Sequence, residues 1–246
     1  MILAVEELSI NAWPALQTML VDGWVLRFAN GYTKRANSIN PLYASERSAA
    51  EKITACEKIY RDRGLPVVFK MTGAAYPEGL DALLAEQGYQ TESVSSVQIL
   101  DLKNWDSSSA RDAAFTPLTL DSWQSDFCRM NGIEGEEQTT HRLMLQSIIP
   151  AACFASLRVE DRIIACGLGI LQGGFLGLFD IVTRPDCRRH GYGERLVRSL
   201  LSWAKHQGAH TAYLQVMLSN APSLRLYARI GFQEAYQYWY RVNHSP

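Results

Sequence analysis

The sequence predicts an α+β protein made of two similar halves, each with a mixed sheet flanked by helices. Short apolar runs with strand-like alternation occur throughout the chain, and segments with helical spacing separate them. Each half also contains the order strand, helix, Gly-aromatic, strand, with Gly88-Tyr89 in the first half and Gly231-Phe232 in the second. This repeated order indicates a duplicated fold.

The first half is expected to open on a β-hairpin. Residues 23–29 alternate apolar and polar side chains, and residues 32–38 return as the partner strand. Between them, Asn30-Gly31 is typical of a two-residue turn with positive φ. The remaining elements of this half are expected to be a helix over 45–61, a strand over 67–71, a helix over 77–87 and a strand over 91–102.

A polar segment separates the halves. Residues 103–116 contain three consecutive serines and show no apolar periodicity, which is typical of a linker. We therefore expect an N-terminal domain over 1–102, a linker over 103–116 and a C-terminal domain over 117–246.

The second half is expected to begin with two helices, over 121–130 and 137–148, that an acidic loop joins. Antiparallel strands are expected next, because three apolar runs follow one another closely. The expected elements after the helices are strands over 152–159, 163–171 and 175–183, a helix over 194–207, a strand over 211–216, a helix over 222–229 and a strand over 232–242.

Composition excludes several classes of protein. The 246 residues carry 24 basic and 25 acidic side chains and are 47% hydrophobic, a profile typical of a globular protein. A net charge of −1 supplies no general attraction for nucleic acid. The longest uncharged run, 163–179, is shorter than a membrane-spanning helix and contains five glycines, so no membrane partner is expected.

The cysteines favour a reducing compartment. All five are widely spaced and none forms a CxxC pair, which argues against a disulfide framework and against a zinc site. The N-terminal residues lack the basic start and apolar stretch of a signal peptide. We expect a cytoplasmic protein.

A glycine-containing loop is the strongest functional signal. Arg188-Arg189-His190-Gly191-Tyr192-Gly193 lies between a predicted strand and a predicted helix, where unpaired amides at the helix start can bind an anion. Residues 184–205 carry six basic and two acidic side chains, a local surplus of four positive charges. The simpler interpretation is a tight turn beside a solvated basic face. A dinucleotide fingerprint fails because Leu196 replaces its third glycine, and no P-loop motif is present.

These motifs together resemble the GNAT superfamily of N-acetyltransferases. Its hallmark, Arg/Gln-x-x-Gly-x-Gly/Ala after the fourth strand, matches residues 188–193. Its second motif resembles Asn220 after the fifth strand and Leu226-Tyr227-x-x-x-Gly231-Phe232. The resemblance is specific over 152–242 and weak in the first half, which is similar to a degenerate copy. It implies a tandem GNAT-like fold.

The resemblance also implies a cosubstrate and its site. Acyl-CoA, most simply acetyl-CoA, would lie between splayed fourth and fifth strands, with its pyrophosphate on the loop and its pantetheine arm paired to a strand backbone. Tyr227 would lie near the sulfur and protonate the departing thiolate as general acid, although an aromatic on such a helix also suits core packing. The expected cofactor-binding residues are Ile181, Val182, Thr183, Arg188, Arg189, His190, Gly191, Tyr192, Gly193, Asn220 and Tyr227.

The group that accepts the proton of the amine is less clearly marked. Some relatives carry a Glu in the fifth strand, but Gln215 stands there and an amide is not a base. Asp180 is the nearest carboxylate in the fourth strand and is the candidate base or water-orienting group, unless strand alternation turns it away. Glu134, Glu136 and Glu137 could attract a cationic amine or could simply be solvated.

Other reactive side chains receive no role. The His190 ring sits at a variable position of the motif, and Cys187 is expected to be a small packed thiol. The remaining histidines show no metal-ligand spacing, so no metal is predicted; they are His141, His206, His210 and His244.

A single cofactor site is expected. The first half lacks glycines and a basic cluster at 39–45, where a second pyrophosphate would have to approach the backbone. The polar patch 35–38 in the same half could face the substrate or could be a solvated strand end.

The sequence therefore predicts an acetyl-CoA-dependent N-acetyltransferase that acts on a primary amine of a small molecule by direct transfer in a ternary complex. Two alternatives stay open, a non-catalytic acyl-CoA-binding or regulatory protein and a protein or peptide N-acetyltransferase. A homodimer is compatible with the aromatic last strand, 232–242, which could offer an edge.

Overall fold

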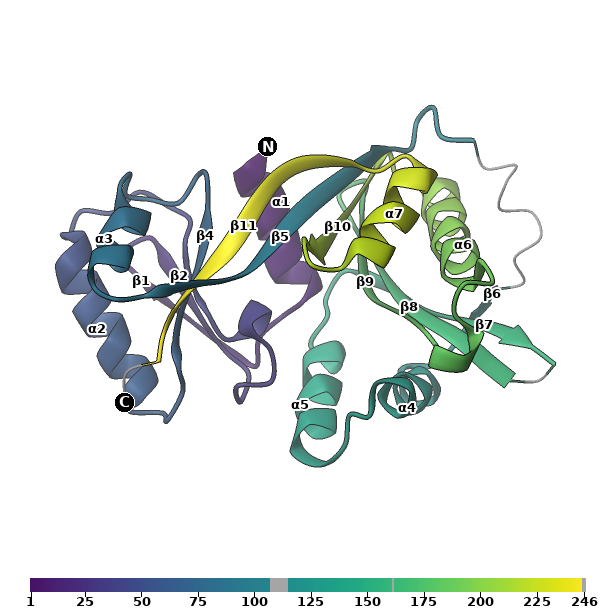
Figure 1. Ribbon diagram of the computed structural model, residues 1–246, viewed down its shortest axis with the longest axis horizontal. Helices are drawn as coiled ribbons and strands as arrows, with labels where there is room; N and C mark the ends of the chain where they lie inside the picture. The colour runs from purple at the N-terminus through teal and green to yellow at the C-terminus, as the bar shows by residue number, and fades with distance from the viewer. Residues whose placement is uncertain (107–114, 161, 245–246) are drawn as a thin grey trace. The chain divides into compact units, whose positions relative to one another are not determined.

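The computed structural model describes residues 1–106, 115–160 and 162–244. The chain forms two compact units (Figure 1): the first comprises Met1–Ser96 and Tyr236–Pro246, and the second comprises Val97–Ala235. Both units mix helices with strands, which confirms the α+β prediction.

The first unit orders its strands β1-β2-β3-β4-β11. Strands β3 and β4 are parallel, whereas β1 with β2, β2 with β3, and β4 with β11 are antiparallel. The elements are α1 (Ile2–Ala12), β1 (Gln17–Val21), β2 (Trp24–Phe28), β3 (Ile39–Pro41), α2 (Ala49–Arg61), β4 (Val67–Thr72), α3 (Leu80–Glu86), the first part of β5 (Gln90–Asp101) and the last part of β11 (Gln233–Asn243).

Aromatic and aliphatic side chains pack between α2, α3 and the strands of this unit. Trp24 meets Phe69 edge-on at 5.6 Å, and Phe69 meets Tyr89 in the same way at 5.5 Å. Every large side chain that alternates inward along β2 and β4 joins this core, which explains why the strands form where apolar alternation predicts them.

The hairpin prediction was wrong in its turn and its partner strand: β2 pairs with β1 and β3, and residues 32–38 hold a short 3₁₀ helix instead of a strand. The observed hairpin joins β1 to β2 through Asp22-Gly23, both with positive φ, as a two-residue turn requires. Asn30 and Gly31 also have positive φ, but they lead into a short 3₁₀ helix, Lys34–Ala36, before β3 pairs with β2. The chain contains two turn signals, and the one that closes the hairpin is the Asp-Gly pair.

Helix α1 was not predicted. Its buried side chains are Val5, Glu6, Ser9 and Ala12, so half of its packed face is polar. A face that includes a glutamate and a serine gives weak apolar periodicity, and the packing of Glu6 against Lys70 of β4 and Tyr236 becomes visible only in the folded chain.

The second unit orders its strands β10-β9-β8-β7-β6. In this order β9 and β10 are parallel, whereas β6 with β7, β7 with β8, and β8 with β9 are antiparallel. Its elements are the end of β5, β6 (Phe115–Pro117), α4 (Leu120–Asn131), α5 (Gly135–Gln146), β7 (Ala151–Val159), β8 (Arg162–Gln172), β9 (Phe175–Thr183), α6 (Tyr192–His206), β10 (Thr211–Met217), α7 (Ala221–Ile230) and the start of β11.

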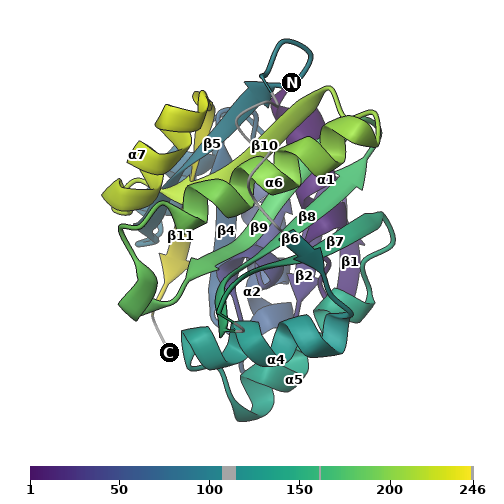
Figure 2. The same cartoon turned by 90° about the vertical axis from the view of Figure 1, so that its right-hand side faces the viewer.

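Helices lie on both sides of these strands (Figures 1 and 2). Leucines of α6 join the inward side chains of β7 to β10 in one apolar core, which Tyr227 and Ile230 of α7 complete. On the other side, Trp123 of α4 contacts Phe154 of β7 and donates a hydrogen bond from Nε1 to the Ala155 carbonyl at 3.0 Å. The two helix pairs are therefore attached to opposite faces.

The path of the chain differs from a simple succession of domains. The second unit begins at Val97, inside β5, and the chain returns to the first unit at Tyr236, inside β11. Residues 115–117 of the expected linker form β6, while residues 107–114 lie outside the described residues. The limits 1–102, 103–116 and 117–246 remain predictions.

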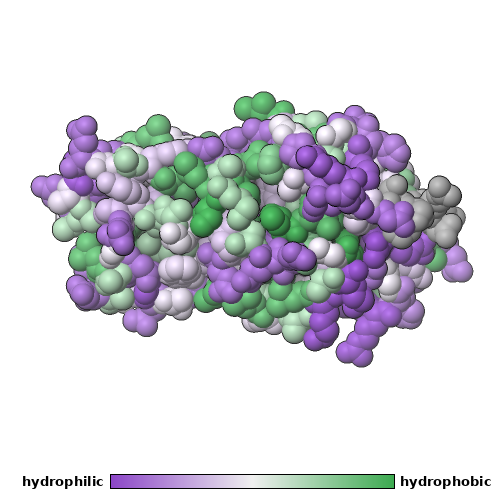
Figure 3. All heavy atoms as spheres, turned by 90° about the horizontal axis from the view of Figure 1, so that it is seen from above, coloured by the Kyte–Doolittle hydropathy of each residue, from purple (hydrophilic) through white to green (hydrophobic). Residues whose placement is uncertain are grey.

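The last strand is not an edge in the first unit. Residues 238–243 of β11 pair with β4, and β5 follows β11 on its other side in the strand order, so the aromatic strand is not available as the dimer edge that the sequence suggested. In Figure 3, hydrophilic residues gather over the part of the second unit that α6 and α7 occupy in Figure 1. Among the described residues, every helix is too short or too polar to traverse a lipid bilayer.

Candidate active site

Strands β9 and β10 are paired over only part of their length. The parallel register joins Phe175–Leu178 with Thr211–Leu214 and covers none of the later residues of either strand. On its other side, β9 stays paired with β8 as far as Thr183. Backbone groups of Ile181, Val182 and Thr183 are therefore unpaired with β10, where an extended ligand could form strand-like hydrogen bonds.

A β-bulge in β9 accompanies this divergence. Cys166 pairs with Val182 and Leu168 with Phe179, so Gly167 alone faces two residues of β9. One of them, Asp180, has φ of +49°, an uncommon conformation for a non-glycine residue. A methyl group on Gly167 would lie 2.7 Å from the Ile181 Cδ1 atom, so the Ile181 side chain would have to shift to admit it. Asp180 contacts His141 of α5, whereas Ile181 packs on the core that the leucines of α6 join.

The loop 188–193 leads directly into α6. Gly191 is the N-cap of the helix, with φ of +79° and no side-chain cap, and a Cβ there would meet no atom within 4 Å. At Gly193, a methyl group would lie 3.1 Å from Thr183 Oγ1 and 3.3 Å from Leu226 Cδ1. The helix start, the end of β9 and α7 thus lie close together, and the first amides of α6 are exposed at Gly191.

Ion pairs engage both acidic side chains of the basic segment around this loop. Asp186 pairs with Arg184 at 3.1 Å and with Arg162 at 3.0 Å, and hydrogen bonding from Arg184 lowers the pKa of Asp186 to about 2. Glu194 pairs with Arg198 at 2.9 Å and Arg229 at 3.2 Å. Two arginines of the sequence cluster are therefore already neutralised by neighbouring carboxylates.

Arg188, Arg189 and His190 are exposed in the loop. Arg188 Nε donates to the Thr183 carbonyl at 3.3 Å, so a ligand that used this carbonyl would have to displace Arg188. The His190 ring stacks on Tyr192 with centroids 6.0 Å apart. Cys187 is half-buried against the core and all five cysteines are free thiols.

Tyr227 and Asn220 both belong to α7. Tyr227 is buried, meets Phe232 edge-on at 5.9 Å, and burial raises its pKa to about 12. Its phenol is therefore protonated at neutral pH, as a general acid must be. Asn220 is the exposed N-cap of the helix, and its Oδ1 accepts from the Ser223 amide at 3.2 Å, which leaves its NH₂ group to face a ligand.

Asp180 lies on the opposite side of the sheet from α6. Its Oδ2 is 3.0 Å from Nε2 of His141 on α5, and its side chain is 15% exposed. Sequence reasoning gave His141 no role, because a single histidine in a helix carries no sign of its partner 39 residues away. Gln215 on β10 is half-buried and supplies no carboxylate.

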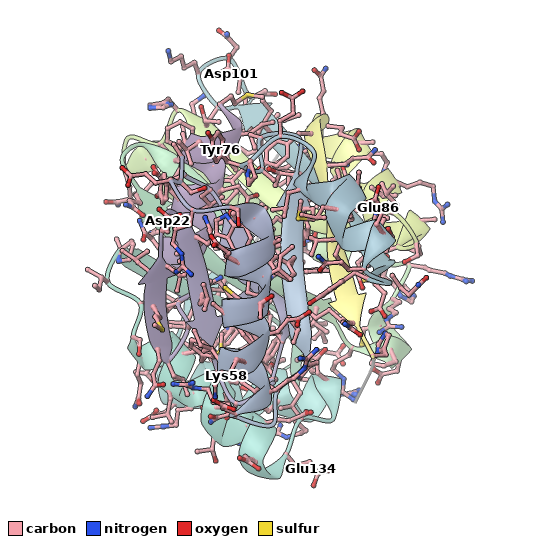
Figure 4. The ribbon with its side chains drawn as sticks, turned by 90° about the vertical axis from the view of Figure 1, so that its left-hand side faces the viewer. Asp22, Lys58, Tyr76, Glu86, Asp101 and Glu134 are labelled. Carbon is pink, nitrogen blue, oxygen red and sulfur yellow. The ribbon has the colours of Figure 1, made fainter. Side chains whose placement is uncertain are left out.

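The three glutamates at the start of α5 are exposed. Glu134 is the N-cap position of the helix and points outward in Figure 4. Glu136 and Glu137 occupy the first turn, where negative charge suits the helix dipole. Among the described residues, no group of three His, Cys, Asp or Glu side chains converges so that it could hold a metal ion.

The divergence of the parallel strands β9 and β10 next to the glycine at the start of α6 is typical of one class of protein, the GNAT-superfamily N-acetyltransferases, and this protein is a member of that class. The chain belongs to the family described as "Probable histone acetyltransferase Rv0428c C-terminal", whose model matches residues 1–241. It is similar to the uncharacterized N-acetyltransferase YobR of Bacillus subtilis, with 28% identity over 97% of each chain.

A shorter match involves the [Ribosomal protein bS18]-alanine N-acetyltransferase of Salmonella typhimurium, 34% identical over 79 residues, which are 32% of this chain and 53% of that protein. The fold is similar to a GCN5-related N-acetyltransferase from Kribbella flavida, with a TM-score of 0.72 at 14% identity over 99% and 96% of the chains. It is also similar to a tandem GNAT protein from the clavulanic acid biosynthesis pathway, with a TM-score of 0.65 at 14% identity over 98% and 89% of the chains. These likenesses confirm the tandem GNAT fold.

Proposed function

We propose that the protein transfers an acetyl group from acetyl-CoA to a primary amine of a small molecule, in a ternary complex without a covalent enzyme intermediate. The observation that carries this proposal is the parting of β9 from β10 next to the uncapped start of α6. Gly193 and Thr183 lie so close that a methyl group on Gly193 would contact Thr183. One ligand could therefore place an anion at the exposed amides and an extended arm along residues 181–183.

The residues fit this cosubstrate in chemistry as well as in position. Exposed amides from Arg188 to Gly193 would bind the pyrophosphate, and the NH₂ group of Asn220 would donate a further hydrogen bond. Acetyl-CoA supplies the acetyl group and a thiolate leaving group when bound. Gly191 suits the approach of a phosphate because a Cβ there faces open space.

Two side chains would move the protons of the reaction. Asp180 would take a proton from the ammonium group, directly or through one water, so that the amine nitrogen can form its bond to the acetyl carbon. As the carbon–sulfur bond breaks, the Tyr227 phenol would give its proton to the thiolate, and the second proton that the nitrogen loses on forming the amide would restore the phenol, while Asp180 releases its proton to solvent. Burial raises the pKa of Tyr227 to about 12, so the phenol carries its proton when the carbon–sulfur bond begins to break.

A protein substrate is the second candidate. The family description contains the words histone acetyltransferase, and the bS18-alanine enzyme acts on a ribosomal protein by its name. The exposed glutamates at the start of α5 could attract a cationic amine of either origin.

The cytoplasm remains the expected compartment, which the five free thiols support.

The test is release of CoA from acetyl-CoA in the presence of two panels, one of small primary amines and one of peptides with free N-termini or lysines. Under the proposal, the small amines turn over faster, and Tyr227→Phe lowers kcat by about tenfold to a thousandfold while the acetyl-CoA Kd stays within about twofold. Faster turnover of peptides would favour the second candidate. No CoA release above background with either panel would reject both.

A further inference from the structure

Three polar side chains from three separate elements form a line in the second unit. Cys128 on α4 lies 3.9 Å from Nδ1 of His141 on α5, measured from its Sγ atom. The other ring nitrogen of His141, Nε2, lies 3.0 Å from Oδ2 of Asp180 on the β9 bulge. The sequence separates these residues by 13 and 39 positions, so only the packing of α4 and α5 on the sheet aligns them.

The imidazole in the middle of this line is tightly held. The His141 side chain is fully buried, and the rings of Phe127 and Trp123 lie at centroid distances of 5.0 and 6.3 Å. Trp123 is itself anchored to β7 by its hydrogen bond to Ala155. A donated hydrogen bond of 2.8 Å from Gln124 Nε2 to the Gln138 carbonyl ties α4 to α5. The ring orientation of His141 is therefore fixed by packing.

Burial differs between the two ends of the line. Cys128 is 2% exposed, and burial raises the pKa of its thiol, so it stays protonated and does not act as a nucleophile. Asp180 is the exposed end, at 15% of its side chain. A substrate can therefore reach the carboxylate, while the thiol and the imidazole stay behind it.

We propose that His141 is a positioning residue for Asp180 in the amine half of the reaction: its Nε2–H donates to Oδ2, which holds the carboxylate in one orientation and leaves Oδ1 to meet the ammonium group. Nδ1 of His141 then accepts from the Cys128 S–H. In this arrangement His141 keeps its Nε2 proton throughout, and the proton from the amine goes to Asp180. The inference rests on the proposed acetyl transfer and adds the residue that orients its base.

The role can be separated from a structural one by a double-mutant cycle. His141→Leu should lower kcat/KM for the fastest amine of the small-amine panel by about tenfold to a hundredfold, because a hydrogen bond to a charged group is lost. In an Asp180→Asn background the same change should have an effect of less than about twofold, because His141 acts through Asp180. His141→Gln, whose amide can donate to the same oxygen, should recover most of the rate.

Calorimetry with acetyl-CoA should give one site per chain and an unchanged Kd for each variant, so that rates are compared per binding site. His210→Leu is the matched control: this half-buried histidine packs on Phe175 at 5.1 Å and does not contact Asp180, and its loss should leave the rate within about twofold. Multiplicative effects of His141→Leu and Asp180→Asn would show a structural role and overturn the proposal.

The protonation state supplies a second readout on the wild-type protein. Long-range ¹H–¹⁵N spectra should show a proton on Nε2 of His141, and a neutral ring with its only proton on Nδ1 would overturn the proposal. Wild-type protein that releases no CoA would overturn the proposed function and this role with it. Wild-type turnover that survives His141→Leu would overturn this role alone.

Discussion

The two units each place a helix start after a parallel strand, and the two helix starts differ in what occupies them. In the first unit, α2 follows β3, which is parallel to β4. The carboxylate of Asp22, from the β1–β2 turn, accepts from the Arg47 amide at 2.9 Å and from the Glu46 amide at 3.1 Å. Figure 4 shows Asp22 near the end of α2 opposite Lys58. The chain's own carboxylate thus binds two amides just before the helix, and the Ser48 side chain caps its start by accepting from the Glu51 amide.

In the second unit, α6 follows β9, which is parallel to β10, and its start has no side-chain cap. Gly191 occupies the N-cap position, and a Cβ at that point would have open space around it. We propose that the occupant of the helix start, more than the strand-helix-strand frame, decides which half can bind a pyrophosphate. This difference supplies a physical reason for the single cofactor site that we propose.

The largest effect is expected when α6 is made to resemble α2. Gly191→Asp would put a carboxylate on the same amides, in a left-handed conformation that Asp tolerates. The Kd for acetyl-CoA should rise by about fivefold to a thousandfold, because like charges about 4 Å apart repel by about 1 to 4 kcal/mol. Calorimetry measures this, with Gly191→Asn as the neutral control of the same size. Equal losses in both variants would show that bulk rather than charge excludes the ligand.

A smaller change at the same position tests the need for glycine alone. Gly191→Ala should weaken acetyl-CoA binding by about tenfold, since a methyl would stand where the phosphate approaches. Gly208→Ala, at the other end of α6, is matched: its φ is +87° against +79°, and a Cβ there also meets nothing within 4 Å. The backbone strain is thus similar in both. A comparable loss in Gly208→Ala would attribute the effect to strain.

Removing the carboxylate charge next to the start of α2 should lower the stability of the protein without creating a cofactor site. Asp22→Asn removes the charge opposite Lys52, whose fully buried ammonium lies 3.6 Å from Asp22 Oδ2. The melting temperature should fall by about 3 °C. Asp62→Asn, which breaks an exposed pair with Lys58, should change it by less than about 1 °C. Acetyl-CoA should still bind once per chain, and a stoichiometry of two would contradict the comparison.

The smallest expected effect is a pH dependence of the gap in melting temperature between the wild type and Asp22→Asn. Hydrogen bonds from the Arg47 and Glu46 amides lower the pKa of Asp22 below 3.8. A carboxyl whose pKa is lowered on folding contributes stability above its unfolded pKa and loses it as the pH falls through the folded value. The melting-temperature gap between wild type and Asp22→Asn should therefore be constant from about pH 7 to 5 and shrink below about pH 4. A gap that widens on acidification would contradict this reasoning.

The path of β11 affects how the two halves can be tested separately. Residues 238–243 pair with β4 in the first unit, although they follow the second unit in the sequence. A cut after Leu102 would therefore leave this strand segment without its partner. The halves are better compared by point substitutions at Gly191 and Asp22 than by truncation.

The sequence by itself determined the fold class, the repeated order of elements and the loop 188–193. These features depend on short-range rules: alternation of apolar residues, the sign of φ at glycines, and the unpaired amides at a helix start. The observed positive φ of Gly191 and Gly231 agrees with such rules, because each is set by its immediate neighbours.

Only the tertiary structure decided which side chains meet. Asp22 reaches the amide of Glu46 across 24 residues, and Asp180 reaches His141 across 39, through a bulge that no local pattern predicts. Helix α1 packs through Glu6, and the observed hairpin turn is Asp22-Gly23, which was not predicted from the sequence. Such pairs depend on strand register and on helix docking, where a shift of one residue redirects a side chain to the other face of the sheet.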